Sequence, residues 1–428
     1  MQKLRALFAY VRHRASSDYQ QSIVRRTAIL CGLVVPGFAA NFLVYFFSAQ
    51  LLPADQFGLF YVALTIGNVL YSGANILNVF LTRHLVRVGE AHGAGAIIPT
   101  TLRLERNIAV TGAACSAAVF LALVLAAKQI GVQSPIIIVL VVLDTYTAYV
   151  TDLGRVLLQS LRRTFWLGIY TIAWMFLRLG LCLAGILMFG TVWGALAGIV
   201  LSALVVFAVF HLIILPGARG VPHPEDIELS LLPLVPAAAG YGLLVLVSNL
   251  DVLFSYFLLS EADLGVYSAS SVFPKAALVV ITPLLQMLIP MMIAGGPSKR
   301  YLGSVMLRIG GAILALTAAG SIMVWLVSDW VCGSRYGLKL CQPQLLAVLL
   351  LSVVPLSLLR TQVVLEFAWG RDLVALWLAV PALAYVPFVW LFPPNMVGLA
   401  SGFAAFSAAA FVFFVISGFA AERLRARA

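Results

Sequence analysis

The chain has 428 residues, of which 62% are hydrophobic and only 10% are charged, whereas soluble domains have roughly 45–50% apolar and about 25% charged residues. This composition excludes a soluble enzyme or binding module and predicts an integral membrane protein. The formal net charge of +11 does not indicate nucleic-acid binding, because the basic residues lie in short segments between apolar runs and not in one patch.

The first segment, residues 1–27, is basic and amphipathic. Leu4, Leu7, Phe8 and Val11 share one helical face while arginines lie elsewhere, which predicts an interfacial helix on the anionic inner leaflet. The apolar run that follows has spanning length and no small-residue cleavage pattern. We therefore expect the first span to remain as an anchor.

Apolar windows of about 20 residues are long enough to cross the hydrocarbon core. Twelve such windows follow one another along the chain: 29–52, 57–82, 107–127, 135–157, 165–189, 191–215, 231–259, 264–293, 305–328, 343–365, 373–392 and 395–420. The predicted fold class is therefore an all-α membrane protein with about twelve transmembrane helices.

Lysine and arginine lie mainly on one side of this predicted topology. They precede the first window, follow the last one, and cluster after the second, fourth and eighth windows. By the positive-inside rule both termini are cytoplasmic, and the expected location is the bacterial inner membrane. The domain prediction is a cytoplasmic interfacial segment 1–27, an N-lobe 28–215, a cytoplasmic linker 216–230, a C-lobe 231–420 and a basic cytoplasmic tail 421–428.

One hairpin occurs twice in the chain. Residues 47–60, FSAQLLPADQFGLF, recur as residues 254–267, FSYFLLSEADLGVY, at an offset of 207 positions. The identical pairs are Phe47/Phe254, Ser48/Ser255, Leu51/Leu258, Leu52/Leu259 and Gly58/Gly265. Because an even number of helices separates the copies, the repeats are parallel and related by an axis along the membrane normal.

Charged residues inside spanning windows are expensive and indicate a functional site or a buried pair. The candidates are Asp144, Asp152, Arg178, Asp251 and Lys275. A substrate or ion role is favoured for the two cations, and the alternative is that they form structural pairs with Asp144 and Asp251. For Asp152 and its neighbour Arg155, snorkelling to the interface is the better interpretation.

Polar stripes accompany these charges in two windows that correspond under the repeat. They consist of Ser268, Ser271, Lys275, Thr282 and Gln286 in one window, and of Asn68, Ser72, Asn75, Asn78 and Thr82 in the other. The stripes are predicted to line a common polar interior. For Asn68, Asn75 and Asn78 the alternative is that they only bridge helices.

Signatures of metal or nucleophilic catalysis are absent from the sequence. Its five histidines form no HExxH pattern and its five cysteines no CxxC pattern, so we expect no catalytic residues, no metal site and no enzymatic activity. Cys332 and Cys341 both fall in the predicted outer loop, where oxidation is allowed. This topology predicts a disulfide between them.

The text of the two hairpins points to a family. NFLVYFFSAQLLPADQFGLFYVALTIGNVL and SNLDVLFSYFLLSEADLGVYSAS resemble the Wzx-type polysaccharide flippases of the multidrug/oligosaccharidyl-lipid/polysaccharide exporter (MOP) superfamily. The resemblance implies two six-helix lobes that form a V around a central, cationic cavity. One departure is Val252 after Asp251, where the family often has a basic residue, and this puts a pairing role around Asp251 in doubt.

The resemblance also implies a substrate and roles for residues. The expected function is flipping of a polyprenyl-diphosphate-linked oligosaccharide for surface polysaccharide, exopolysaccharide or O-antigen biosynthesis, with glycosyltransferases and a polymerase of the pathway as partners. The predicted site comprises Lys275, Arg178, Asn68, Asn75, Ser271 and Gln286 for substrate in the cavity, Arg83 and Arg155 at the cytoplasmic entrance, and Asp144, Asp251 and Asp152 for ion coupling. No cofactor is expected beyond a coupling Na⁺ or H⁺.

Two other functions stay open. A multidrug exporter of the same superfamily differs only in substrate, and a membrane enzyme of glycan assembly is a third possibility, although such enzymes usually have a large outer loop. A major facilitator lacks support, because LTRHLVRVGEAHG does not match its signature loop. For the flippase, Lys275→Ala and Arg178→Ala are each predicted to block polysaccharide production without lowering membrane abundance.

Overall fold

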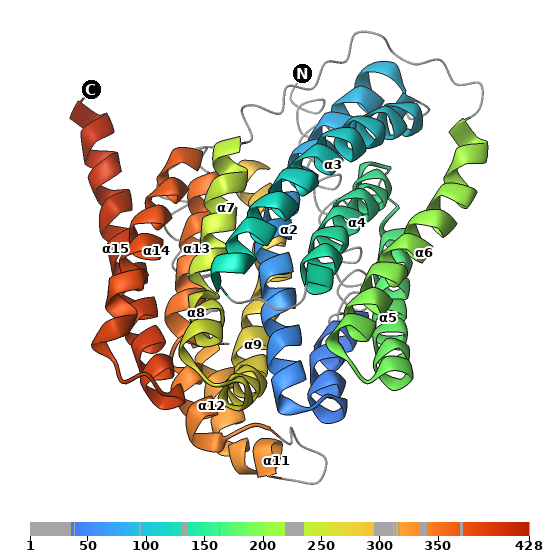
Figure 1. Ribbon diagram of the computed structural model, residues 1–428. Helices are drawn as coiled ribbons and strands as arrows, with labels where there is room; N and C mark the ends of the chain where they lie inside the picture. The colour runs from blue at the N-terminus through green and yellow to red at the C-terminus, as the bar shows by residue number, and fades with distance from the viewer. Residues whose placement is uncertain are drawn as a thin grey trace.

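The computed structural model describes residues 36–37, 39–93, 96–130, 135–161, 163–218, 235–294, 311, 314–315, 317–333, 340–368 and 371–427. Within these ranges the chain is helical, with no strand, and each of the twelve predicted windows contains helix. The all-α membrane fold predicted from composition is confirmed. Figure 1 shows the helices running mostly along one direction, with α11 at the end of the molecule opposite the C-terminus.

The helices follow one another with short connections. Their bounds are Ala39–Leu51, α2 Ala54–His92, α3 Ile97–Ile130, α4 Pro135–Ser160, α5 Thr164–Phe189, α6 Val192–Ala218, α7 Val235–Val247, α8 Leu250–Leu258, α9 Glu261–Ala294, Thr317–Leu326, α11 Ser328–Gly333, α12 Pro343–Leu350, α13 Val353–Ala368, η3 Asp372–Leu378, α14 Ala379–Phe388, η4 Val389–Leu391 and α15 Met396–Arg427.

Eight helical segments of the described chain are long and apolar enough to span a membrane, or nine if the bent pair α7 and α8 is one span. Of the other three predicted windows, 29–52 and 305–328 are described only in part, and 264–293 lies within α9, whose side chains are described as far as residue 278. Helix ends differ from the prediction where polar residues extend a helix beyond its apolar window. The clearest case is α3, which begins at Ile97 and not at 107.

The predicted domain bounds stay a prediction. Residues 1–27 and most of the linker 216–230 lie outside the described residues, although α6 continues to Ala218. α15 continues through residues 421–427 of the predicted basic tail.

The duplicated hairpin has the same backbone geometry in both copies. The first helix of each copy ends at Leu51 and Leu258, and the second begins at Ala54 and Glu261. The hydrogen bonds also correspond: Leu52 N donates to Ser48 O as Leu259 N donates to Ser255 O, at 2.9 and 3.0 Å. The sequence repeat is therefore a structural repeat.

The two hairpins pack against each other where α2 crosses α9. A Cβ atom added at Gly58 would lie 2.9 Å from the backbone N of Gly265, and one added at Gly265 would lie 2.1 Å from the carbonyl O of Ala54. Only glycine permits backbones to approach this closely. The repeated glycine pair thus sets the distance between the two halves.

The helices form two groups that meet at α2. In the N-terminal group α4 packs on α2, α3, α5 and α6, and in the C-terminal group α9 packs on α12 and α13. α2 also packs on α7, α8 and α9, so it joins the groups (Figure 1). Phe42 adds a ring contact to Phe273 of α9, with 5.1 Å between centroids.

Candidate functional site

The C-terminal group contains a buried ion cluster around Asp251 of α8. Lys275 Nζ of α9 lies 2.8 Å from Asp251 Oδ1, and the hydroxyl of Tyr267 donates to Asp251 Oδ2 at 3.1 Å. The carboxylate has no exposed surface. A buried carboxylate is tolerated when it is paired and hydrogen-bonded in this way. The structure therefore brings together two of the predicted site residues and adds Tyr267.

Lys275 also contacts the break between α7 and α8. These helices form a 51° bend at Ser248 and Asn249, and the ammonium group donates a hydrogen bond to the Ser248 carbonyl. Its Nζ lies 4.5 Å from the centroid of the Phe403 ring of α15, which favours a cation over the ring face. Because a carbonyl at a helix end carries partial negative charge, Lys275 stabilises the broken helix as well as Asp251.

The N-terminal group holds a second pair with looser geometry. Arg178 Nη2 of α5 lies 3.7 Å from Asp144 Oδ2 of α4, and both side chains are largely buried. Arg178 Nε has no hydrogen-bond acceptor among the described residues. Close to this pair, Asn68 of α2 donates to the Tyr45 hydroxyl at 3.5 Å. This is an ion pair without a direct hydrogen bond, so the guanidinium retains donors that another acceptor can use.

Asp152 is the centre of a third cluster. Its side chain is fully buried and accepts hydrogen bonds from Tyr71 and from Asn78 of α2, the latter at 2.6 Å, and from Arg155 at 3.0 Å. The snorkelling interpretation is therefore wrong for Asp152. Sequence spacing suggested it because Asp152 lies near a helix end, but α2 covers this face of α4 and supplies two donors.

The polar stripes do not all face one interior. Ser271 is fully buried and donates to the Ser268 carbonyl within its own helix. Asn68 is exposed, whereas Asn78 binds Asp152. The side chains of three predicted site residues, Asn75, Arg83 and Gln286, lie outside the described part of the chain.

The sequence interpretation missed other buried ionisable groups. Arg360 of α13 donates to the Leu278 carbonyl of α9 at 3.1 Å. Glu366, almost fully buried, lies 3.6 Å from Arg371, and Glu105 of α3 lies 3.0 Å from His211 of α6. The rule that flags charge inside an apolar window would have selected Arg360. Glu105, Glu366 and His211 stand near window ends, where that rule gives no signal.

A cavity of about 340 Å³ lies between α3, α4 and α6. Neither Lys275 nor Arg178 lines it, so it is not the central cationic cavity expected from the resemblance.

No three histidine, cysteine or acidic side chains among the described residues are grouped so that they could hold a metal ion.

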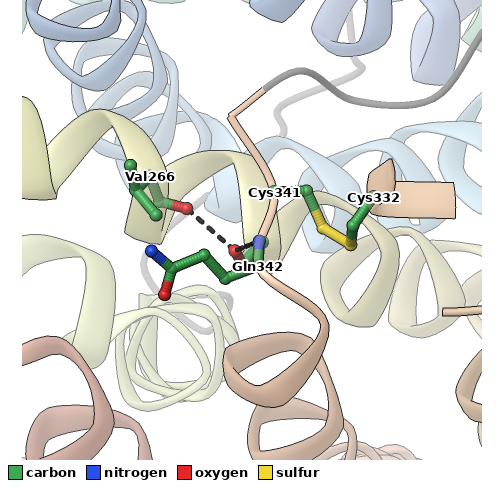
Figure 2. The surroundings of a disulfide bond; sticks show 5 residues. Val266, Cys332, Cys341 and Gln342 are labelled. Carbon is green, nitrogen blue, oxygen red and sulfur yellow. Dashed lines mark hydrogen bonds between the residues drawn. A yellow bond between two sulfur atoms is a disulfide. The ribbon is translucent and has the colours of Figure 1, made fainter. Parts of the chain in front are cut away.

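Cys332 and Cys341 form a disulfide, as predicted from their place in one loop. Figure 2 shows it next to Gln342, whose backbone N donates to Ser270 Oγ at 3.1 Å, while Ser270 Oγ donates to the Val266 carbonyl at 2.9 Å. The disulfide thus joins α11 to the segment that enters α12, and the hydrogen bonds attach this segment to α9.

Solved transporters share the fold of this chain. A multidrug resistance MATE family transporter of the MOP superfamily in an inward-facing conformation aligns with a TM-score of 0.69 at 15% identity, over 94% of this chain and 98% of that one. A mutant of the Vibrio cholerae MATE transporter VcmN gives 0.63 at 17% identity, over 96% and 98%. These similarities establish the MOP-type fold.

A further solved structure has a binding site of different charge. A MOP superfamily transporter from Pyrococcus furiosus, for which a reverse polarity of the binding pocket suggests a different function, gives a TM-score of 0.67 at 13% identity, over 94% of this chain and 97% of that one. No family model and no curated protein matches the sequence.

Proposed function

We propose that this chain is a flippase that moves a polyprenyl-diphosphate-linked oligosaccharide across a bacterial inner membrane by alternating access, for surface polysaccharide assembly. Support comes from the MOP-type fold, from the hairpin resemblance, and from Arg178, a largely buried cation whose Nε has no acceptor among the described residues. A diphosphate in a low-dielectric site requires cations, because charge attraction there is far stronger than in water.

The observation that carries the proposal is the incomplete hydrogen bonding of the buried Arg178 guanidinium. Its guanidinium is largely buried, its carboxylate partner lies 3.7 Å away, and its Nε has no acceptor among the described residues. A buried donor without an acceptor costs roughly 1–3 kcal/mol. A phosphate oxygen would remove this cost, and guanidinium binds phosphate with two parallel hydrogen bonds.

Asp144, next to Arg178, is the best candidate for ion coupling. A phosphate that binds Arg178 competes with this carboxylate, so Asp144 would take up H⁺ or Na⁺ when its partner turns to substrate. Asp251 and Asp152 are less suited, because each already receives several hydrogen bonds. The expected coupling is therefore one cation per substrate at the N-terminal pair.

A multidrug exporter remains the second candidate. Asp144 is a largely buried carboxylate, which suits an organic cation, and transporters of the same fold include a multidrug resistance protein. The charge of the substrate separates the two functions. An anionic substrate needs Arg178, whereas a cationic drug would bind better once Arg178 is removed.

The deciding experiment compares Arg178→Ala with Arg163→Ala, which removes an exposed arginine immediately before α5. Purified protein in proteoliposomes is assayed for flipping of a fluorescent polyprenyl-diphosphate oligosaccharide and, separately, for ethidium export. We expect Arg178→Ala to lower flipping at least about tenfold, the effect of losing roughly 1.4 kcal/mol of binding, and Arg163→Ala to leave it unchanged.

Other outcomes would contradict the flippase. Flipping that is equal in both variants removes Arg178 from the substrate site. Ethidium export by the wild-type protein, increased by Arg178→Ala, together with no flipping by any variant, would favour the drug exporter.

A further inference from the structure

The cavity between α3, α4 and α6 lies outside the proposed transport site. Each helix supplies one face to it: Leu102, Glu105, Arg106 and Ala109 from α3, Tyr146, Thr147, Val150 and Thr151 from α4, and Leu204, Phe207 and His211 from α6. Its volume of about 340 Å³ falls within the range of pockets that hold small organic ligands. The residues at its edge, Arg106 and Leu204, are exposed.

The surroundings of this cavity are those of a lipid-facing surface. Only 6% of the apolar window of α3 is buried within the structure, against 61% for α2 and 56% for α4. Apolar side chains on this side, such as Val110 of α3 and Val205 of α6, are exposed. In a bilayer such a surface is covered by acyl chains, because no water is present to cover it.

The charged side chains around the cavity differ in their surroundings: two contact each other, and one is exposed at the edge. Glu105 and His211 contact each other at 3.0 Å and so bridge α3 and α6. Tyr146 uses its hydroxyl to bind the Ala109 carbonyl at 3.3 Å. Arg106 is exposed at the edge, on the turn of α3 that the positive-inside rule places near the anionic inner leaflet. The edge thus presents a cation next to an apolar interior.

We infer that this cavity is a binding site for an anionic phospholipid of the inner leaflet, with one acyl chain between α3, α4 and α6 and the phosphate at the Arg106 guanidinium. The apolar walls match the chain, and the arginine matches the phosphate. The bound acyl chain would fill the space between α3 and α6 next to the Glu105–His211 contact. The inference is independent of the transported substrate, because α2 makes the contact with the C-terminal group while α3, α4 and α6 form the cavity.

The test uses the full chain in nanodiscs that contain a phosphatidylglycerol with a diazirine in one acyl chain, or the corresponding phosphatidylcholine. After irradiation, labelled peptides are mapped by mass spectrometry. We expect labels on the cavity faces of α3, α4 and α6. Arg106→Gln should lower phosphatidylglycerol labelling about fivefold, as expected for roughly 1 kcal/mol per basic residue near an anionic lipid, and leave phosphatidylcholine labelling unchanged.

Matched variants separate the site from the surface around it. Ala109→Trp fills the cavity, whereas Ala113→Trp adds the same ring one turn further along α3, at an exposed position that does not line it. Arg103→Gln removes an exposed arginine of α3 that also does not line it. Only Ala109→Trp and Arg106→Gln should lower labelling.

Two results would overturn the inference. The first is labelling of the cavity faces that is equal for both lipids and for Arg106→Gln and Arg103→Gln. The second is labelling that Ala109→Trp and Ala113→Trp change equally. If Ala109→Trp fails to give a monodisperse protein, the arginine variants, which lie on the surface, decide alone.

Discussion

The two groups of helices share a duplicated hairpin but hold their buried charge differently. In the C-terminal group the ion cluster lies on the two helices of the repeated hairpin, where Asp251 of α8 binds Tyr267 and Lys275 of α9. At the offset of 207 the N-terminal copy has Val44, Phe60 and Asn68 instead. Its ion pair, Asp144 with Arg178, lies on α4 and α5 and is looser, at 3.7 Å against 2.8 Å.

A second difference concerns the outer loops. Cys332 and Cys341 cross-link the loop of the C-terminal group, while the corresponding positions of the N-terminal group, 125 and 134, are Leu125 and Ser134. The C-terminal group is thus braced twice, by a tight ion cluster and by a disulfide. We propose that its ion pair mainly supports the fold, whereas the N-terminal pair keeps a guanidinium available for a ligand.

The sharpest test of this contrast is Lys275→Ala. It leaves the fully buried Asp251 carboxylate with the Tyr267 hydroxyl and no cation, and breaking a buried pair costs about 3–5 kcal/mol. We expect a large loss of thermal stability and of membrane abundance, measured by fluorescence-detected size-exclusion chromatography after heating. This differs from the sequence-based prediction of unchanged abundance.

The double variant Asp251→Asn with Lys275→Met is the control for this loss. Replacing a buried ion pair by groups of similar volume is often neutral. Stability should therefore return towards the wild-type value in the double variant. A stable Lys275→Ala protein would show that the C-terminal pair does not brace the fold.

The disulfide is the second largest expected effect. Cys332→Ser removes a link that closes a short loop, with a sequence separation of 9, and the chain-entropy model assigns about 3 kcal/mol to such a loop. Thermal unfolding should shift to lower temperature in Cys332→Ser, and reductant should produce the same shift in the wild-type protein. Cys115→Ser, at an exposed free thiol, should change nothing.

The glycine pair between the groups tests whether they approach as closely as the structure shows. Gly265→Ala would place a Cβ 2.1 Å from the Ala54 carbonyl oxygen, and overpacking costs typically about 1–3 kcal/mol. Lower thermal stability is therefore expected. Gly180→Ala, with nothing within 4 Å of the added Cβ, should stabilise α5 by up to about 1 kcal/mol, so equal effects would contradict the close contact.

Arg178→Lys should have the smallest effect on stability, below about 1 kcal/mol, because charge is kept and the pair with Asp144 is not hydrogen-bonded. Flipping should nevertheless fall, since an ammonium group cannot make the two parallel hydrogen bonds of a guanidinium to phosphate. Both the flipping rate and the thermal stability are measured, each relative to the wild-type protein, for Arg178→Lys and for Lys275→Arg. Loss of stability with unchanged flipping for Arg178→Lys would assign this pair to the fold as well.

Much of the architecture could be predicted because it depends on local signals. Apolar windows of spanning length predicted helices, and each of the twelve windows contains helix. The repeated hairpin residues predicted matching turns, and the turn after Leu51 matches the turn after Leu258. The break between α7 and α8 could not be predicted from proline positions, because it falls at Ser248 and Asn249.

The candidate site was predicted only in outline. Asp251 was correctly considered a partner for Lys275, and Asp144 a partner for Arg178. Asp152 was placed at the interface, yet Tyr71 and Asn78 bury it. Helical spacing shows which residues share a face of one helix, but it does not show which other helix covers that face.

The sequence by itself determined that this protein lies in a membrane, where its helices run and that one hairpin occurs twice, because hydrophobicity and turn chemistry act over neighbouring residues. Only the tertiary structure decided which charges are tight pairs and which keep a donor without an acceptor among the described residues. These differences depend on how helices rotate and pack, over distances of an ångström, and the contrast between 2.8 Å at Lys275 and 3.7 Å at Arg178 is the result.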